Sequence, residues 1–443
     1  MDAREIGLDP TQLERVTEVI EADVGAERYD GAVVLVARHG QVALHEAVGF
    51  AERASDRLAG TDDVFHLFSV TKTFTAALVL RCVERGQIQL TTPVAEIIPE
   101  FGVKGKQRVT IAQLLTHTGG MPVELPFIPI DQLGDTEAVA LAVCNQALQS
   151  KPGRIVSYGP IGAFAVLGEI VRRVDGGSRP FRQIMEDELF VPLGMKNTSL
   201  SLRPDLASRL APVVVRDRTA GIIPPEALES INVLHSECFE MPGGGALGTA
   251  HDLFRWAEML RRGGELDGVR ILSPALLKLA VTNHTGSEPN HIFDAMCEAR
   301  GWDQFPAYLG LGFFLRGVGI FPMPFGLTAS SDTFGGLGAG STMFWVDPQR
   351  DLAFVCLTTG VLEDSRNFER LARLSDLVLA AVTYPTRRHL RREAVFPTGV
   401  EPQSFSGAST SSASQTIYRA EPLQLSKSDT QQADFSMNLD ISV

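Results

Sequence analysis

Two pairs of β-rich segments, one near each end of the chain, enclose a centre with mostly helical patterns. The four segments are residues 32–37, 42–48, 341–346 and 352–358. Each pair is joined by a short polar turn of the kind that connects antiparallel strands. Amphipathic helical patterns lie beside both pairs, at residues 13–24 and 366–382. Because a sheet buries its apolar faces against helices, this order predicts an α+β fold in which one antiparallel sheet is built from both termini and flanked by helices.

The same order predicts the domain organisation. The sheet and its helices take up about residues 1–66 and 300–384, and an all-helical lobe is inserted between them at about residues 67–299. Together these parts form one domain over residues 1–384. The Ser/Thr-rich and polar segments that follow Pro385 lack the periodicity of a packed domain. We therefore expect residues 385–443 to be a polar, mostly disordered tail.

Composition excludes several classes of function. A net charge of −13 over 443 residues disfavours a nucleic-acid-binding surface. No apolar run reaches the roughly 18 residues that a membrane span needs, and the first residues lack the apolar core of a secretory signal, so we expect a cytoplasmic protein. The five cysteines are odd in number and dispersed, which favours free thiols over disulfides or a metal site.

A candidate nucleophile lies at the start of an apolar helical pattern. Ser69 and Lys72 form an S-x-x-K sequence, and residues three apart lie on one face of a helix. A buried lysine can lose its proton, whereas an arginine effectively cannot. The pair therefore suits a serine activated by a lysine, although the spacing alone is also met by a capping serine and a solvated lysine.

Further motifs decide between these interpretations. They are Ser69-Val70-Thr71-Lys72, Leu114-Leu115-Thr116-His117-Thr118-Gly119-Gly120-Met121-Pro122, Pro192-Leu193-Gly194-Met195, Gly263-Gly264-Glu265-Leu266 and Trp345-Val346-Asp347-Pro348. In this order they resemble the serine β-lactamase-like superfamily, in particular its class C β-lactamase and esterase branch, which is related to the DD-peptidases. The resemblance covers about residues 10–383 and implies a β-lactamase/transpeptidase-like fold.

The resemblance implies a role for three residues. Ser69 would attack an acyl carbonyl and form an acyl-enzyme, with Lys72 as the activating lysine. Tyr158 matches the tyrosine of a Tyr-x-Asn motif, and would act as a general base that passes protons together with Lys72. A free phenol has a pKa of about 10. A neighbouring ammonium would favour the phenolate, so we expect the two groups to titrate as a coupled pair.

The chain departs from the family pattern at two positions. Pro160 stands where the family has asparagine, and it offers no side-chain donor and no N–H. Phe334 stands where the family has a cation that meets the substrate's carboxylate. Both changes weaken the case for recognition of a peptide or a β-lactam. An aromatic residue followed by two glycines, here Gly335 and Gly336, is similar to the esterases and transesterases of the family.

Other parts of a substrate site follow from the same resemblance. The backbone N–H groups of Ser69 and Leu337 would form the oxyanion hole, and Gly335 and Gly336 would let substrate lie against the strand. His66 is a candidate for the pocket entrance, whereas His117 is interpreted as a buried structural histidine. The aromatic residues of an apolar acyl pocket would be Trp302, Tyr308 and the run at 321–325.

The favoured function is a cofactor-free serine hydrolase or acyltransferase that acts on a small-molecule ester or thioester, including a carrier-bound acyl group. A second hypothesis is a D-amino-acid peptidase, a weak β-lactamase or a peptide-cyclising thioesterase. A third is a binding protein on the same scaffold without catalysis, which the two altered motifs keep open.

Overall fold

The computed structural model describes residues 2–219 and 221–383. The chain divides into two units, Met1–Thr386 and Arg387–Val443, and the account below concerns the first of them. The tail predicted for residues 385–443 lies outside the described residues.

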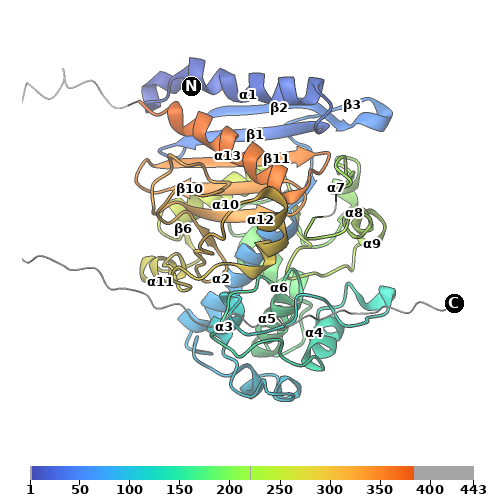
Figure 1. Cartoon of the computed structure of the whole chain (residues 1–443). Helices are drawn as coiled ribbons and strands as arrows, with labels where there is room; N and C mark the ends of the chain where they lie inside the picture. Colours follow the sequence, from blue (N-terminus) through green and yellow to red (C-terminus); the bar gives the residue numbers. More distant parts are fainter. Residues whose placement is uncertain (1, 220, 384–443) are drawn as a thin grey trace, which may run out of the picture. The chain divides into compact units, whose positions relative to one another are not determined.

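A seven-stranded sheet joins the two ends of the first unit. Its strands follow the order β3-β2-β1-β11-β10-β9-β8. Their bounds are β1 Gly31–Arg38, β2 Gln41–Glu52, β3 Arg57–Leu58, β8 Phe314–Leu315, β9 Phe334–Gly338, β10 Thr342–Asp347 and β11 Leu352–Thr359. All six pairings are antiparallel, and β1 from the N-terminal part lies directly against β11 from the C-terminal part, with Val34 opposite Cys356. The predicted sheet built from both termini is confirmed (Figure 1).

Helices cover both faces of the sheet. Helices α1 (Pro10–Gly25) and α13 (Asp364–Ala380) pack against each other on one face, and α10 (Ala250–Arg261) contacts β1, β10 and β11 on the other (Figure 1). Every residue of β1 and of β11 is therefore buried, as expected for strands covered on both sides. Helix α10 comes from the part of the sequence expected to form the inserted lobe, yet it packs on the sheet.

The inserted helices surround α2 (Thr71–Glu84), which carries Lys72. The remaining elements of this part are α3 Ile111–Leu115, α4 Thr136–Cys144, α5 Gly162–Val174, α6 Phe181–Met185, α7 Pro204–Ala207, α8 Pro225–Glu229, α9 Ile231–Leu234, α11 Pro274–Ala280, α12 Asp294–Arg300, β4 Phe65–His66, β5 Leu247–Gly248, β6 Glu265–Leu266 and β7 Val269–Arg270. Helix α2 contacts α5 and is buried along almost its whole length, because it lies between the sheet and the other helices. Its first turn is therefore fixed from several sides.

The core around α2 gives a stability prediction. Phe74 is fully buried, and its ring meets those of Phe190 and Trp256 edge-on at centroid distances of 5.2 and 4.9 Å. Phe74→Ala is expected to lower the free energy of unfolding by about 3–5 kcal/mol, because it leaves a cavity in close-packed surroundings. Chemical denaturation measures this change. Phe127→Ala, at a side chain that is 94% exposed, is the control and should change stability by less than about 0.5 kcal/mol.

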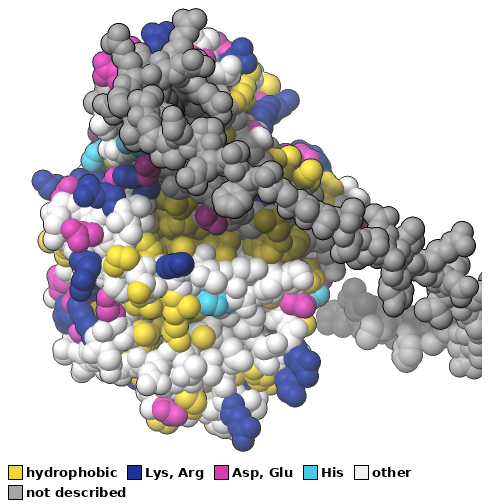
Figure 2. Space-filling view, turned by 90° about the vertical axis from the view of Figure 1, so that its left-hand side faces the viewer, with side chains coloured by type: hydrophobic (Ala, Val, Ile, Leu, Met, Phe, Trp, Pro, Cys, Tyr) yellow, Lys and Arg dark blue, Asp and Glu magenta, His cyan; other side chains and the backbone are white. Residues whose placement is uncertain are grey.

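The surface mixes apolar and charged groups. Figure 2 shows one face on which hydrophobic side chains gather near the middle, with acidic and basic side chains around them. Apolar atoms make up a large share of any protein surface, so this mixture needs no special explanation. Within residues 2–219 and 221–383, no helix has both the length and the apolar character required to cross a membrane.

Candidate active site

Ser69 lies in a 3₁₀ turn, Phe68–Val70, that leads directly into α2. The preceding residue, Phe68, has a left-handed φ of 45°, which is unusual for a residue other than glycine. Thr71 holds this turn from within, because its hydroxyl donates to the Phe68 carbonyl at 2.6 Å and accepts from the Ala246 N–H at 3.0 Å. The backbone is thus constrained around Ser69, where the start of α2 meets strands β9 and β10.

Lys72 is buried beside Ser69. Its Nζ lies 2.9 Å from the Ser69 Oγ, 2.6 Å from the Pro160 carbonyl oxygen and 2.7 Å from the Gly243 carbonyl oxygen. Burial of the side chain lowers the pKa of Lys72 to about 7. The proline that replaces the family's asparagine therefore still binds the lysine, because a backbone carbonyl needs no particular side chain.

Tyr158 completes the cluster. Its side chain is hydrogen-bonded to that of Ser69, and its ring lies 4.9 Å from the Lys72 Nζ. Burial raises the pKa of Tyr158 above its ordinary value, and this outweighs the opposite effect of the hydrogen bond with Ser69. A protonated phenol therefore faces Ser69 at neutral pH, in place of the phenolate that the sequence led us to expect.

Two buried residues fix the loop that carries Tyr158. His117 accepts a hydrogen bond from the Gly159 N–H on its Nδ1 at 3.2 Å, and its ring lies 4.3 Å from that of Tyr158. Burial, with a smaller contribution from the charge of Lys72, lowers the pKa of His117 to about 3, so the ring is neutral. Asn290 accepts from the Tyr158 N–H on its Oδ1 at 3.1 Å. These contacts agree with a structural role for His117.

An apolar cavity opens beside Ser69. Its lining residues are Ser69, Tyr158, Pro160, Ile222, Ile223, Phe293, Phe314, Leu337, Gly338, Ala339, Asp364, Asn367, Phe368 and Leu371. None of them is a lysine or an arginine. The carboxyl group of Asp364 accepts from the Ile222 N–H at 2.7 Å, and burial raises its pKa to about 6. The wall thus offers apolar contacts and no cation for a substrate carboxylate.

Three of the predicted substrate-site residues line this region. Pro160 and Leu337 border the cavity together with Ser69, so both backbone groups expected to form the oxyanion hole belong to residues of one wall. Gly336 lines a smaller adjoining cavity with Ser69, Lys72 and His117.

The other predicted substrate-site residues lie elsewhere. Phe334 is 2% exposed and packs edge-on against Phe313 at 5.8 Å, within the core. A Cβ at Gly335 would stand 2.0 Å from the Phe344 carbonyl oxygen, so glycine is required there by the approach of β10. His66 is also buried, with its ring 5.1 Å from that of His235.

The aromatic residues suggested for the acyl pocket are not on the wall beside Ser69. Trp302, Tyr308 and residues 321–325 are absent from its lining. Phe321 stacks on Phe305 at 5.7 Å, and Phe305 stacks on Phe293, which does border the cavity. Phe321 therefore lies behind the wall, whereas Met323 and Phe325 belong to the core between the sheet and the terminal helices.

Many of the residues that line the cavity beside Ser69 could not be identified from the sequence patterns. Asn367, Phe368 and Leu371 come from α13, whose amphipathic pattern predicts core packing and no contact with Ser69. Gly243 begins a run of three glycines, and nothing in the sequence indicates that its carbonyl binds Lys72. These residues meet Ser69 only because the fold brings distant segments together.

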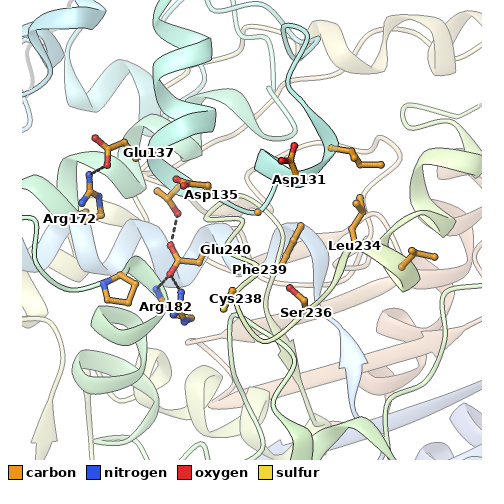
Figure 3. Close-up of a pocket in the computed structure, with 15 residues that line it drawn as sticks. Asp131, Asp135, Glu137, Arg172, Arg182, Leu234, Ser236, Cys238, Phe239 and Glu240 are labelled. Carbon is orange, nitrogen blue, oxygen red and sulfur yellow. Dashed lines mark hydrogen bonds and ion pairs between the residues drawn. The ribbon is translucent and has the colours of Figure 1, made fainter.

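A larger cavity, of about 740 Å³, lies between the loop before α4 and residues 233–240 (Figure 3). It shares no lining residue with the cavity beside Ser69. Both arginines of its lining are ion-paired, since Arg172 binds Glu137 at 2.5 Å and Arg182 binds Glu240 at 2.7 Å. The Thr136 hydroxyl also donates to Glu240. Dashed lines in Figure 3 mark both ion pairs.

The fold and this site define a class of protein. An antiparallel sheet built from both termini, with inserted helices and a Ser-x-x-Lys serine at the junction, is the arrangement expected of the β-lactamase-like proteins. The chain belongs to the Beta-lactamase family, whose model matches residues 16–378. The resemblance inferred from the motifs is confirmed.

Individual relatives agree with this assignment. The chain is 31% identical to the esterase EstB of Burkholderia gladioli over 291 residues, which are 59% of this chain and 73% of the esterase. It is 33% identical to penicillin-binding protein 4 of Amycolatopsis lactamdurans over 276 residues, or 60% and 70% of the two chains. The crystal structure of a penicillin-binding protein homologue from Caulobacter crescentus matches with a TM-score of 0.70 and 26% identity, covering 85% of this chain and 99% of that one.

Proposed function

We propose that this protein is a serine esterase or acyltransferase that forms an acyl-enzyme on Ser69 from an ester or thioester with an apolar acyl part. The observation that carries the proposal is the buried Lys72 Nζ at 2.9 Å from the Ser69 Oγ, beside an apolar cavity. The similarity to the esterase EstB supports hydrolytic chemistry. The proposal keeps the reaction class expected from the sequence, but it gives the role of base to Lys72 and changes Tyr158 from a general base to a proton donor.

Lys72 acts as the base in this proposal. A neutral amine has two N–H donors and one lone pair, and two of the three close partners of Nζ are carbonyl oxygens that can only accept. With its N–H groups on Pro160 and Gly243, the lone pair of neutral Lys72 is directed at the Ser69 hydroxyl. A pKa of about 7 makes this neutral form abundant at physiological pH.

Tyr158 supplies a proton in this proposal. Ser69 Oγ bonds to the acyl carbon while its proton passes to Lys72, which gives a tetrahedral intermediate. When the bond to the leaving group breaks, the protonated phenol of Tyr158 gives its proton to the departing oxygen or sulfur, and the lysine ammonium restores the phenol. The raised pKa of Tyr158 supports the role of acid over that of base. The intermediate's oxyanion would be bound by the Ser69 and Leu337 N–H groups.

The cavity wall favours a neutral ester over a β-lactam or a D-amino-acid peptide. Both of the latter carry a carboxylate, and the cavity beside Ser69 has no lysine or arginine among its lining residues but does have Asp364. A carboxylate there would meet a like charge in apolar surroundings. The similarity to a penicillin-binding protein keeps the peptidase and β-lactamase hypothesis as the second candidate.

Mass spectrometry of the intact protein tests the function. We expect a fluorophosphonate probe to add one equivalent to the protein, and p-nitrophenyl esters and acyl thioesters to add one acyl mass transiently in quenched reactions. Peptide mapping should locate both adducts on Ser69. Absence of adducts together with absence of turnover would favour a binding protein without catalysis. Turnover of a chromogenic cephalosporin at a rate comparable to the esters would favour the β-lactamase alternative.

A further inference from the structure

An arginine-lined cavity lies apart from Ser69. It has a volume of about 580 Å³ and is bordered by the end of α1, by residues 216–217, by the end of α12 and by α13. Its arginines are Arg28, Arg216, Arg300, Arg366, Arg370 and Arg373. Its carboxylates are Asp23, Glu27, Asp217 and Glu369. Six arginines against four carboxylates leave an excess of two positive charges, in a chain whose net charge is −13. The lining is thus net positive, although the protein as a whole is net negative.

Five of the six arginines have carboxylate partners. Arg28 and Arg373 bind Asp23, Arg216 binds Asp30, Arg366 binds Asp217 and Arg300 binds Glu369. Several of these side chains remain partly exposed, with Arg28 and Arg366 each 59% accessible. Their N–H groups are therefore accessible to a ligand as well as to the carboxylates.

Arg370 differs from the other five. It is 5% exposed, and among the described residues no carboxylate lies within ion-pair distance of it. Its Nη atoms donate to the Thr358 hydroxyl, the Ser341 carbonyl and the Asn367 side chain, but its buried Nε makes no hydrogen bond. A guanidinium cannot shed its proton to relieve burial. The described protein offers it a cation–π contact, since the guanidinium lies 4.8 Å from the centroid of the Tyr29 ring, but no negative charge within ion-pair distance. An anion in the cavity would supply that counter-charge.

We propose that this cavity binds a small molecule with two clustered anionic groups, of the diphosphate type. Arginine forks match the oxygen geometry of phosphate and carboxylate, and a dianion balances the excess of two positive charges. A volume of about 580 Å³ is within the range of small-molecule sites. The arginines come from four separate segments, so the bound molecule would bridge α1 and α13.

Binding at this cavity and reaction at Ser69 are distinguishable. Helix α13 separates the two cavities, with Arg370 on one and its hydrogen-bond partner Asn367 on the other. The arginine cavity contains neither Ser69 nor Lys72. Ser69→Ala should therefore bind the anion with unchanged affinity, whatever the outcome of the acylation experiment.

Isothermal titration calorimetry at constant ionic strength tests the proposal, with pyrophosphate, inorganic phosphate and citrate as probes. We expect saturable binding of pyrophosphate with one site per chain, weaker binding of inorganic phosphate, and affinity lowered about tenfold in Arg28→Gln and in Arg366→Gln. Arg218→Gln is the matched control, because Arg218 is 56% accessible and paired with glutamates but lies outside the cavity.

The probes also separate the sources of the anion. Citrate binding more tightly than pyrophosphate would identify a polycarboxylate as the occupant, and the reverse order would identify a phosphate compound. Non-saturating heats with all three anions, or equal weakening in Arg218→Gln, would overturn the proposal in favour of unspecific attraction.

Discussion

Ser69→Ala is expected to lower kcat/KM for a p-nitrophenyl ester at least about a thousandfold and to abolish labelling by a fluorophosphonate probe. Alanine has no oxygen to attack the acyl carbon, so the covalent route is lost and only the binding contribution of the site remains. The fold should be retained, because Lys72 keeps its two carbonyl partners and Val70 and Thr71 still hold the turn. Circular dichroism and thermal unfolding check this.

Ser331→Ala, at an exposed serine that borders neither of the cavities beside Ser69, is the control and should leave both labelling and turnover unchanged. Turnover by Ser69→Ala close to that of the wild type would place the reaction at another residue. Loss of turnover in both variants would point to damage to the fold or to the preparation.

The fold could be predicted from the sequence because its sheet is built mainly from hairpins, whose strands and turns have clear local sequence patterns. Residues 32–48 and 341–358 form hairpins by local turns, and the sheet closes where their inner strands pair, Val34 opposite Cys356. Ser69 and Lys72 lie within one helical turn, so their approach is also set locally. Features encoded within a few residues could therefore be predicted.

Features that depend on strand register or on backbone atoms could not be predicted from the sequence. Phe334 occupies the motif position of a substrate-binding residue, yet its side chain points into the core, because the face of a strand residue depends on its pairing partner, here Val346. From the sequence, Pro160 only removes a donor from the site, whereas in the structure its carbonyl oxygen binds Lys72. The wall from α13 lies some three hundred residues along the chain from Ser69, and no local pattern connects the two.

Lys72→Met is expected to lower kcat/KM by about 10²–10⁴-fold, since the base that receives the Ser69 proton is removed. In the wild type, kcat/KM should rise with pH through about 7, because neutral Lys72 is the active form. This limb should be absent from the residual activity of Lys72→Met. Lys72→Arg tests the role of the proton, because its guanidinium keeps the charge but cannot act as a base, so it should be as inactive as methionine. A retained pH limb with near-normal turnover would exclude Lys72 as the base.

The stability of Lys72→Met relative to the wild type is also expected to depend on pH in a defined direction. The pKa of Lys72 falls from 10.5 in the unfolded chain to about 7 in the folded protein, so between these values the unfolded chain binds more protons. The stability of the wild type relative to Lys72→Met should therefore rise as the pH increases from about 7 to 10.5, and should be constant below 7, where both states hold the proton. Lys72→Met also removes the hydrogen bonds to the Pro160 and Gly243 carbonyl oxygens. That loss of stability does not depend on pH, so it displaces the plot of stability difference against pH without changing its slope. Chemical denaturation of both proteins at pH 6, 7, 8.5 and 10 measures how the difference in their free energies of unfolding changes with pH. A difference that does not vary with pH would show that Lys72 stays charged in the folded protein. Lys72 could then not act as the base.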